Sequence, residues 1–110
     1  MVRRKAKSPQ TDARAVWDGA LEALGRAARQ LMDVGDGIAE MDSTRCLIDL
    51  TEAQVGFGML AKANATPQWT VPLYEGVSDM IEGLESHDVP LYQSGFTHCQ
   101  AVLAEVYPDA

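Results

Sequence analysis

The stretch that decides the fold is residues 17–38, WDGALEALGRAARQLMDVGDGI. Apolar or small residues recur in it at alternating steps of four and three. They are Trp17, Leu21, Leu24, Ala28, Leu31, Gly35 and Ile38. This spacing places all of them on one side of an α-helix, where they form a narrow seam. Because such a seam has to be buried, the stretch predicts a long helix that packs against others.

The same spacing returns in the second half of the chain. One run is Leu73, Val77, Met80 and Leu84, and the next is Tyr92, Phe96, Cys99, Leu103 and Val106. Proline is favoured in the first turn of a helix, so Pro72 and Pro90 are each expected to open one. The chain is therefore expected to end in two helices. The first stops at 86–88, and the second reaches Tyr107.

The segment between these regions leaves two arrangements open. Its apolar face is made by Leu47, Leu50, Gln54, Phe57 and Ala61, and Ile48, Val55 and Met59 widen it. The seam loses its register near 42–44. Residues 33–65 therefore form either one long helix with a shift in register or two helices, the second capped by Asp42 or Ser43.

Composition and these patterns predict an all-α fold. Aromatic residues make up 6% of the chain, which disfavours a sheet sandwich. We expect an antiparallel helical bundle or helical hairpin with a long first helix, which begins near residue 11 and ends near Met41, and three to five helices in all. A chain of 110 residues is one domain by size. We assign 1–10 as a flexible basic tail and 11–110 as a single helical domain.

Charge is distributed unevenly along the chain. The net charge is −7, yet four basic residues lie in the first seven positions. Beyond Arg29 only Arg45 and Lys62 are basic, against 13 acids. A surface with this balance repels phosphate, so we expect no nucleic-acid partner. We see no secretory signal and no apolar run of the roughly 20 residues that span a membrane. A cytoplasmic location is expected.

No residue cluster predicts a chemical reaction, and we expect no catalytic, cofactor or metal site. His98 and Cys99 are adjacent, so on a helix they point about 100° apart and cannot easily share an ion. Arg45 beside Cys46 would lower a thiol pKa, but no histidine is near in sequence. The roles of Cys46, His98 and Cys99 stay open. Arg45 and Asp49 are expected to form an i,i+4 pair on the surface, with Glu52 as a neighbour on the same face.

Two helical segments are apolar over more than one narrow stripe. Val16, Ala20, Ala23 and Ala27 flank the first seam, and Ile48, Val55 and Met59 flank the second. This additional apolar surface is either buried inside a bundle or dimer, or it contacts a partner outside the protein. We predict an interaction face that contains Trp17, Leu21, Leu24, Leu31, Ile38, Val55 and Met59, and we expect the protein to form a homo-oligomer.

The middle of the chain resembles the phasin-like proteins of bacteria. The resemblance lies in 38–50, IAEMDSTRCLIDL, and 60–69, LAKANATPQW, and it would cover about 17–85. The family pattern has an Arg, an Asp one turn later and a helix end of the type Leu-Ala-(Lys/Arg)-Ala. Arg45, Asp49 and the Leu-Ala-Lys-Ala run at 60–63 occupy these positions here. The resemblance implies a protein without catalytic residues that coats polyhydroxyalkanoate granules through amphipathic helices and self-associates.

Two other classes of function fit the same features. An acidic helical protein with a surplus apolar face also suits an adaptor or chaperone that grips a partner helix. An enzyme ranks third, because a catalytic site in a helical bundle needs inward carboxylates or histidines at paired spacing.

Overall fold

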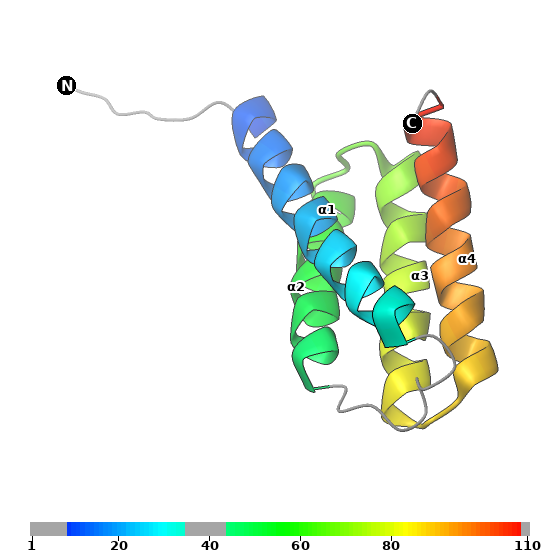
Figure 1. Cartoon of the computed structure of the whole chain (residues 1–110). Helices are drawn as coiled ribbons and strands as arrows, with labels where there is room; N and C mark the ends of the chain where they lie inside the picture. Colours follow the sequence, from blue (N-terminus) through cyan, green and yellow to red (C-terminus); the bar gives the residue numbers. More distant parts are fainter. Residues whose placement is uncertain (1–8, 35–43, 109–110) are drawn as a thin grey trace.

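The computed structural model describes residues 9–34 and 44–108. They form four helices (Figure 1), α1 (Pro9–Val34), α2 (Thr44–Lys62), α3 (Pro67–Glu85) and α4 (Val89–Val106). No strand occurs in these ranges, so the all-α prediction is confirmed. At 26 residues α1 is the longest helix, against 19, 19 and 18 for the others.

Consecutive helices are antiparallel neighbours. The main contacts join α1 to α2, α2 to α3 and α3 to α4. In Figure 1, α2, α3 and α4 stand side by side and α1 crosses them obliquely. The first and last helices are therefore not packed together along their length. The bundle stays open between α1 and α4.

Residues 33–65 contain parts of two helices. α1 and α2 lie against each other in opposite directions, with Ala27 near Cys46 and Ala20 near Gly56. One continuous helix is therefore excluded. The expected helix end near Met41, the seam positions Gly35 and Ile38 and the two predicted capping residues lie outside the described residues.

The buried side of α1 differs from the predicted seam. Its buried residues are Ala20, Ala23, Leu24 and Ala27. Of the predicted seam, Leu24 is buried, whereas Trp17, Leu21 and Ala28 are only half-buried. The physical reason is the close approach of α2, because a Cβ added to Gly56 would lie 2.8 Å from the Cβ of Ala20. Small side chains occupy the crossing, and the larger ones lie at its edges.

Glycines bring α3 and α4 into backbone contact. A Cβ at Gly83 would lie 2.5 Å from the backbone nitrogen of Tyr92, and one at Gly95 would lie 2.5 Å from the carbonyl oxygen of Gly76. Around this contact Leu73, Val77, Met80 and Leu84 are buried, as the spacing predicts. In the α4 run Tyr92 and Cys99 are buried, and Phe96, Leu103 and Val106 pack half-buried against the core.

The predicted start of α4 is confirmed, but that of α3 is wrong. Pro90 lies in the first turn of α4, and the Asp88 side chain accepts a hydrogen bond of 3.1 Å from the backbone N–H of Leu91. Pro67, not Pro72, opens α3. Pro72 lies inside the helix and cannot donate to the carbonyl of Gln68. Gln68 is exposed, so water can reach that end of the helix.

Candidate binding surfaces

The side of α2 that faces away from the core carries exposed apolar residues. Ile48, Val55 and Met59 are 62%, 55% and 56% exposed, whereas Leu50, Ala53 and Phe57 on the other side are fully buried. We call the residues that follow this outer side the outer stripe. They are Arg45, Ile48, Glu52, Val55, Met59 and Lys62, spaced three and four apart. The stripe spans about 25 Å of helix.

Tyr74 and Ser78 of α3 contact α2 beside the outer stripe. Tyr74 is 40% exposed, and its ring lies against Gly58 of α2, where an added Cβ would come within 3.2 Å. One turn before Gly58 in α2, the Gln54 amide donates a hydrogen bond of 3.0 Å to the Ser78 hydroxyl. These contacts fix the edge of α3 next to α2. Tyr74 and the outer stripe therefore belong to adjoining surface.

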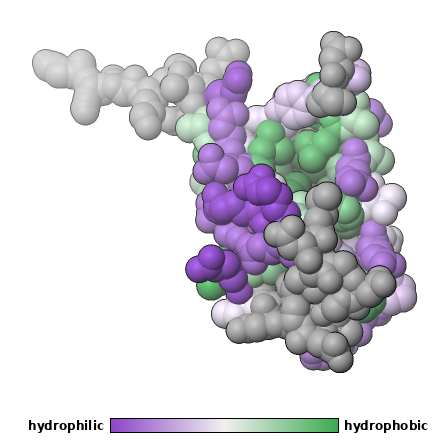
Figure 2. All heavy atoms as spheres, viewed as in Figure 1, coloured by the Kyte–Doolittle hydropathy of each residue, from purple (hydrophilic) through white to green (hydrophobic). Residues whose placement is uncertain are grey.

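A second apolar surface is the cleft between α1 and the end of α4. Its volume is about 820 Å³. Its walls are formed by Ala13, Arg14, Ala15, Trp17, Asp18, Leu60, Ala65, Thr66, Trp69, Val106 and Tyr107. Figure 2 shows residues of high hydropathy gathered in the hollow beside the upper half of α1. The size falls in the range of small-molecule and peptide sites.

Both tryptophans of the chain line this cleft. The Trp17 indole packs edge-on against Phe57, with ring centroids 5.8 Å apart. Its N–H donates a hydrogen bond of 3.0 Å to the Tyr107 hydroxyl across the mouth of the cleft. Trp69, in the first turn of α3, also lines the cleft. Fluorescence of the protein therefore reports on this cleft.

The turn between α2 and α3 closes one end of the cleft in a strained conformation. Thr66 has φ 42°, in the left-handed region that β-branched residues rarely adopt. The Thr70 hydroxyl, fully buried, donates to the carbonyl oxygens of Ala65 and Thr66 at 3.1 and 3.2 Å. These hydrogen bonds hold the turn in place, and they set the position of Trp69 in the cleft.

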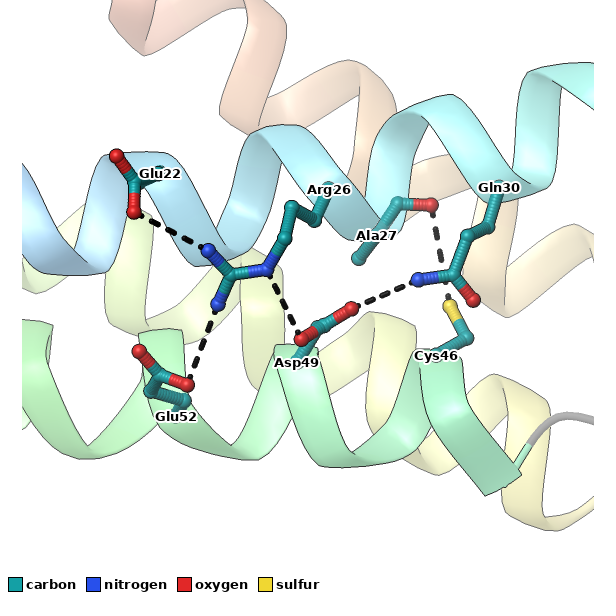
Figure 3. Close-up of polar contacts among 7 residues, drawn as sticks. All are labelled: Glu22, Arg26, Ala27, Gln30, Cys46, Asp49 and Glu52. Atoms are coloured by element: carbon teal, nitrogen blue, oxygen red, sulfur yellow. Dashed lines mark hydrogen bonds and ion pairs between the residues drawn. The ribbon is translucent and has the colours of Figure 1, made fainter.

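A polar network crosses the interface between α1 and α2 (Figure 3). The Arg26 guanidinium contacts Asp49, Glu22 and Glu52, each at 3.3 Å. The Gln30 amide donates to the second Asp49 oxygen at 2.7 Å. The hydrogen bond that Arg26 donates to Asp49 raises the pKa of Arg26. The predicted pairing of Asp49 with Arg45 is wrong, because Asp49 is buried and faces α1.

The two cysteines are free thiols buried in the core. Burial raises the pKa of Cys46 to about 11 and that of Cys99 to about 12. The predicted lowering of the Cys46 pKa by Arg45 is therefore wrong, because desolvation dominates and Asp49 acts in the same direction. Their Sγ atoms lie 3.9 Å from the carbonyl oxygens of Ala27 and Leu73. His98 is exposed.

Neither a metal-binding cluster nor a membrane-spanning helix occurs within residues 9–34 and 44–108. No three His, Cys, Asp or Glu side chains there lie together in a way that would hold a metal ion. None of the helices in those ranges has the length and apolar character needed to cross a membrane.

The structure divides the predicted interaction face. Val55 and Met59 lie on the outer stripe. Trp17 lines the cleft, Leu21 is half-buried against the core and Leu24 is buried in it. The side chain of Leu31, and Ile38 as a whole, lie outside the described residues. The described members of the predicted interaction face are thus divided among the outer stripe, the cleft and the core. The contributions of Trp69 and Tyr107 were missed, although Trp69 directly after the Thr66–Pro67 break is a visible signal.

In comparisons with known proteins, no family model, curated protein or solved structure matches this chain.

Proposed function

We propose that this protein is a non-catalytic binding protein that attaches to an apolar surface in the cytoplasm through the outer stripe of α2. The observation that supports this is the exposure of Ile48, Val55 and Met59, each more than half exposed on a helix whose other side is buried. Complete burial of such a side chain is worth roughly 1.5–3 kcal/mol. An apolar stripe that stays in water is typical of an interaction site.

The surface we propose is that of a polyhydroxyalkanoate granule. The resemblance to phasin-like proteins supports this choice, because Arg45 and Asp49 of α2 carry part of the resemblance and Arg45 lies on the outer stripe. Self-association of the protein is part of the same proposal. A folded bundle that attaches along α2 leaves its other helices available for contacts between copies.

Co-sedimentation with polyhydroxybutyrate particles tests the proposal. We expect saturable binding that reaches the same plateau on repeated titration, whereas a folded helical protein of similar charge but no exposed apolar stripe stays in the supernatant. Analytical ultracentrifugation of the free protein over a range of concentrations tests self-association. A protein that never binds the particles would contradict the attachment, and a monomer at every concentration would contradict the oligomer.

A second candidate function is that of an adaptor that grips a partner helix. The cleft between α1 and α4 supports it, since its volume of about 820 Å³ and its aromatic walls suit the apolar face of a short helix. Titration with an amphipathic model peptide, followed by tryptophan fluorescence, tests this function. Because both tryptophans line the cleft, occupation should shift the emission and saturate at one peptide per chain. No change at saturating peptide would contradict the adaptor.

A further inference from the structure

The outer stripe has a positive charge at each end. Arg45 and Lys62 are the only arginine or lysine residues beyond Arg29 in the whole sequence, and both are exposed. Neither takes part in the ion pairs found among the described residues. The only acid of the stripe is Glu52, which pairs with Arg26 at 3.3 Å. Arg45 and Lys62 thus lie at the two ends of the exposed apolar residues of the outer stripe, Ile48, Val55 and Met59.

The charges disfavour a second copy as the partner of this stripe. If two outer stripes paired in antiparallel fashion with Ile48 opposite Met59, Arg45 would lie opposite Lys62. In a parallel pair each cation would lie opposite its own copy. Like charges brought together across an interface are unfavourable. The complementary partner therefore carries negative charge at the positions of the two cations and apolar groups between them.

The shape of α2 favours a flat partner. The stripe lies on the opposite side of the helix from the buried residues Leu50, Ala53 and Phe57, so it is an outward ridge rather than a groove. Helices that lie on a lipid layer insert their apolar side chains below the headgroups and hold Lys and Arg at headgroup level. Tyr74 at the edge of the ridge suits the same depth, because its ring is apolar and its hydroxyl is polar.

We infer that the surface that α2 meets is an anionic phospholipid layer. Arg45 and Lys62 contact the acidic headgroups, and the three exposed apolar side chains of the outer stripe enter the acyl region. The exposed acids of α3, among them Glu75, Glu82 and Glu85, are repelled by such a layer, which fixes the orientation with α2 toward it. This inference rests on the proposed function, in which the outer stripe is the binding face.

Vesicle binding of four proteins tests the inference. Vesicles of phosphatidylcholine alone are compared with vesicles of equal parts phosphatidylcholine and phosphatidylglycerol, in the same buffer. The proteins are the wild type, Arg45→Gln/Lys62→Gln, Val55→Gln/Met59→Gln and Arg29→Gln. The last is the matched control, because Arg29 is an exposed arginine of α1, outside the outer stripe.

We expect the wild type to bind the anionic vesicles more tightly than the neutral ones. Loss of both stripe cations should weaken anionic binding by roughly 30-fold, about 5-fold per charge, and leave neutral binding unchanged. Val55→Gln/Met59→Gln should weaken both, and Arg29→Gln should match the wild type. Equal wild-type binding to the two vesicles, an equal loss in Arg29→Gln, or no vesicle binding at all would overturn the inference.

The outcome separates the inference from the proposed function. A wild type that coats bare polyhydroxybutyrate particles but ignores the anionic component of vesicles overturns the inference alone. A wild type that binds anionic vesicles through the outer stripe but never binds the particles contradicts the proposed attachment to a granule and supports the inference. The protein could instead capture an acidic partner protein through Arg45 and Lys62 and bind no vesicles. That result would also overturn the inference that α2 meets a lipid layer.

Discussion

The Trp17 indole N–H donates a hydrogen bond of 3.0 Å to the hydroxyl of Tyr107, which joins α1 to the end of α4 across a distance of 90 residues in sequence. The two helices are otherwise not packed along their length. This single bond therefore bridges the mouth of the cleft. Tyr107 directly follows α4, as the residue that caps its end.

Removal of that hydroxyl should open the cleft at a small cost. We expect Tyr107→Phe to lower the free energy of unfolding by roughly 0.5–1.5 kcal/mol, the typical net value of one hydrogen bond, and to shift the tryptophan emission to the red. Urea denaturation and fluorescence measure both effects. Tyr74→Phe is the control, because Tyr74 is not among the residues that line the cleft and its ring lies against Gly58. Equal spectra for the wild type and Tyr107→Phe would contradict the bridge.

The glycine contact between α3 and α4 makes a sharp prediction about stability. Gly83→Ala would place a Cβ 2.5 Å from the backbone nitrogen of Tyr92, so the two helices must separate. We expect a loss of roughly 2 kcal/mol or more in the free energy of unfolding. Gly19→Ala is the matched control, because nothing lies within 4 Å of the added atom, and it should stabilise α1 by up to about 1 kcal/mol. Similar stabilities for both variants would show that the two helices are not this close.

The buried carboxylate of Asp49 should matter to the α1–α2 interface. Asp49→Ala removes the acceptor that Arg26 and Gln30 share across the interface. We expect a loss of roughly 1–3 kcal/mol in the free energy of unfolding, measured by chemical denaturation. Asp18 serves as the control, since its ion pair with Arg14 is exposed and Asp18→Ala should cost less than about 0.5 kcal/mol. If Asp49→Ala is as mild as Asp18→Ala, the interface does not depend on the network.

The raised thiol pKa values predict how stability changes at high pH. A thiol that is harder to ionise in the folded state stabilises the fold fully below its ordinary pKa of 9.0, and the benefit is lost as pH rises toward about 11 for Cys46 and about 12 for Cys99. We expect the free energy of unfolding to fall more steeply above pH 9 in the wild type than in Cys46→Ala/Cys99→Ala. Parallel curves for the two proteins would show that the thiols are not protected by the fold.

The sequence predicts the helices of the second half well and the inner side of α1 less well. In α3 the apolar residues at the predicted spacing, Leu73, Val77, Met80 and Leu84, are all buried, so the spacing identifies the inner face. In α1 the buried side is the one that packs closely against Gly56 of α2. Alanines fit this close contact better than Trp17 or Leu21. The pattern of large residues alone therefore points to a neighbouring side of the helix.

The candidate site divides in the same way. Ile48, Val55 and Met59 are identifiable from sequence as apolar residues beyond what one seam needs, and the structure leaves them exposed. The cleft could not be predicted, because it depends on the oblique crossing of α1 and brings together Trp17, Trp69 and Tyr107 from three separate parts of the chain.

The most direct test of the central claim compares Val55→Gln/Met59→Gln with the wild type in binding to polyhydroxybutyrate particles. Both side chains are more than half exposed, so the variant should keep the helical spectrum and stability of the wild type. The control is Gln93→Ala/Gln100→Ala, which changes two exposed residues of α4. We predict that the stripe variant loses particle binding and that the control retains it. Undiminished binding of a folded stripe variant would contradict the claim that the outer stripe of α2 is the binding face.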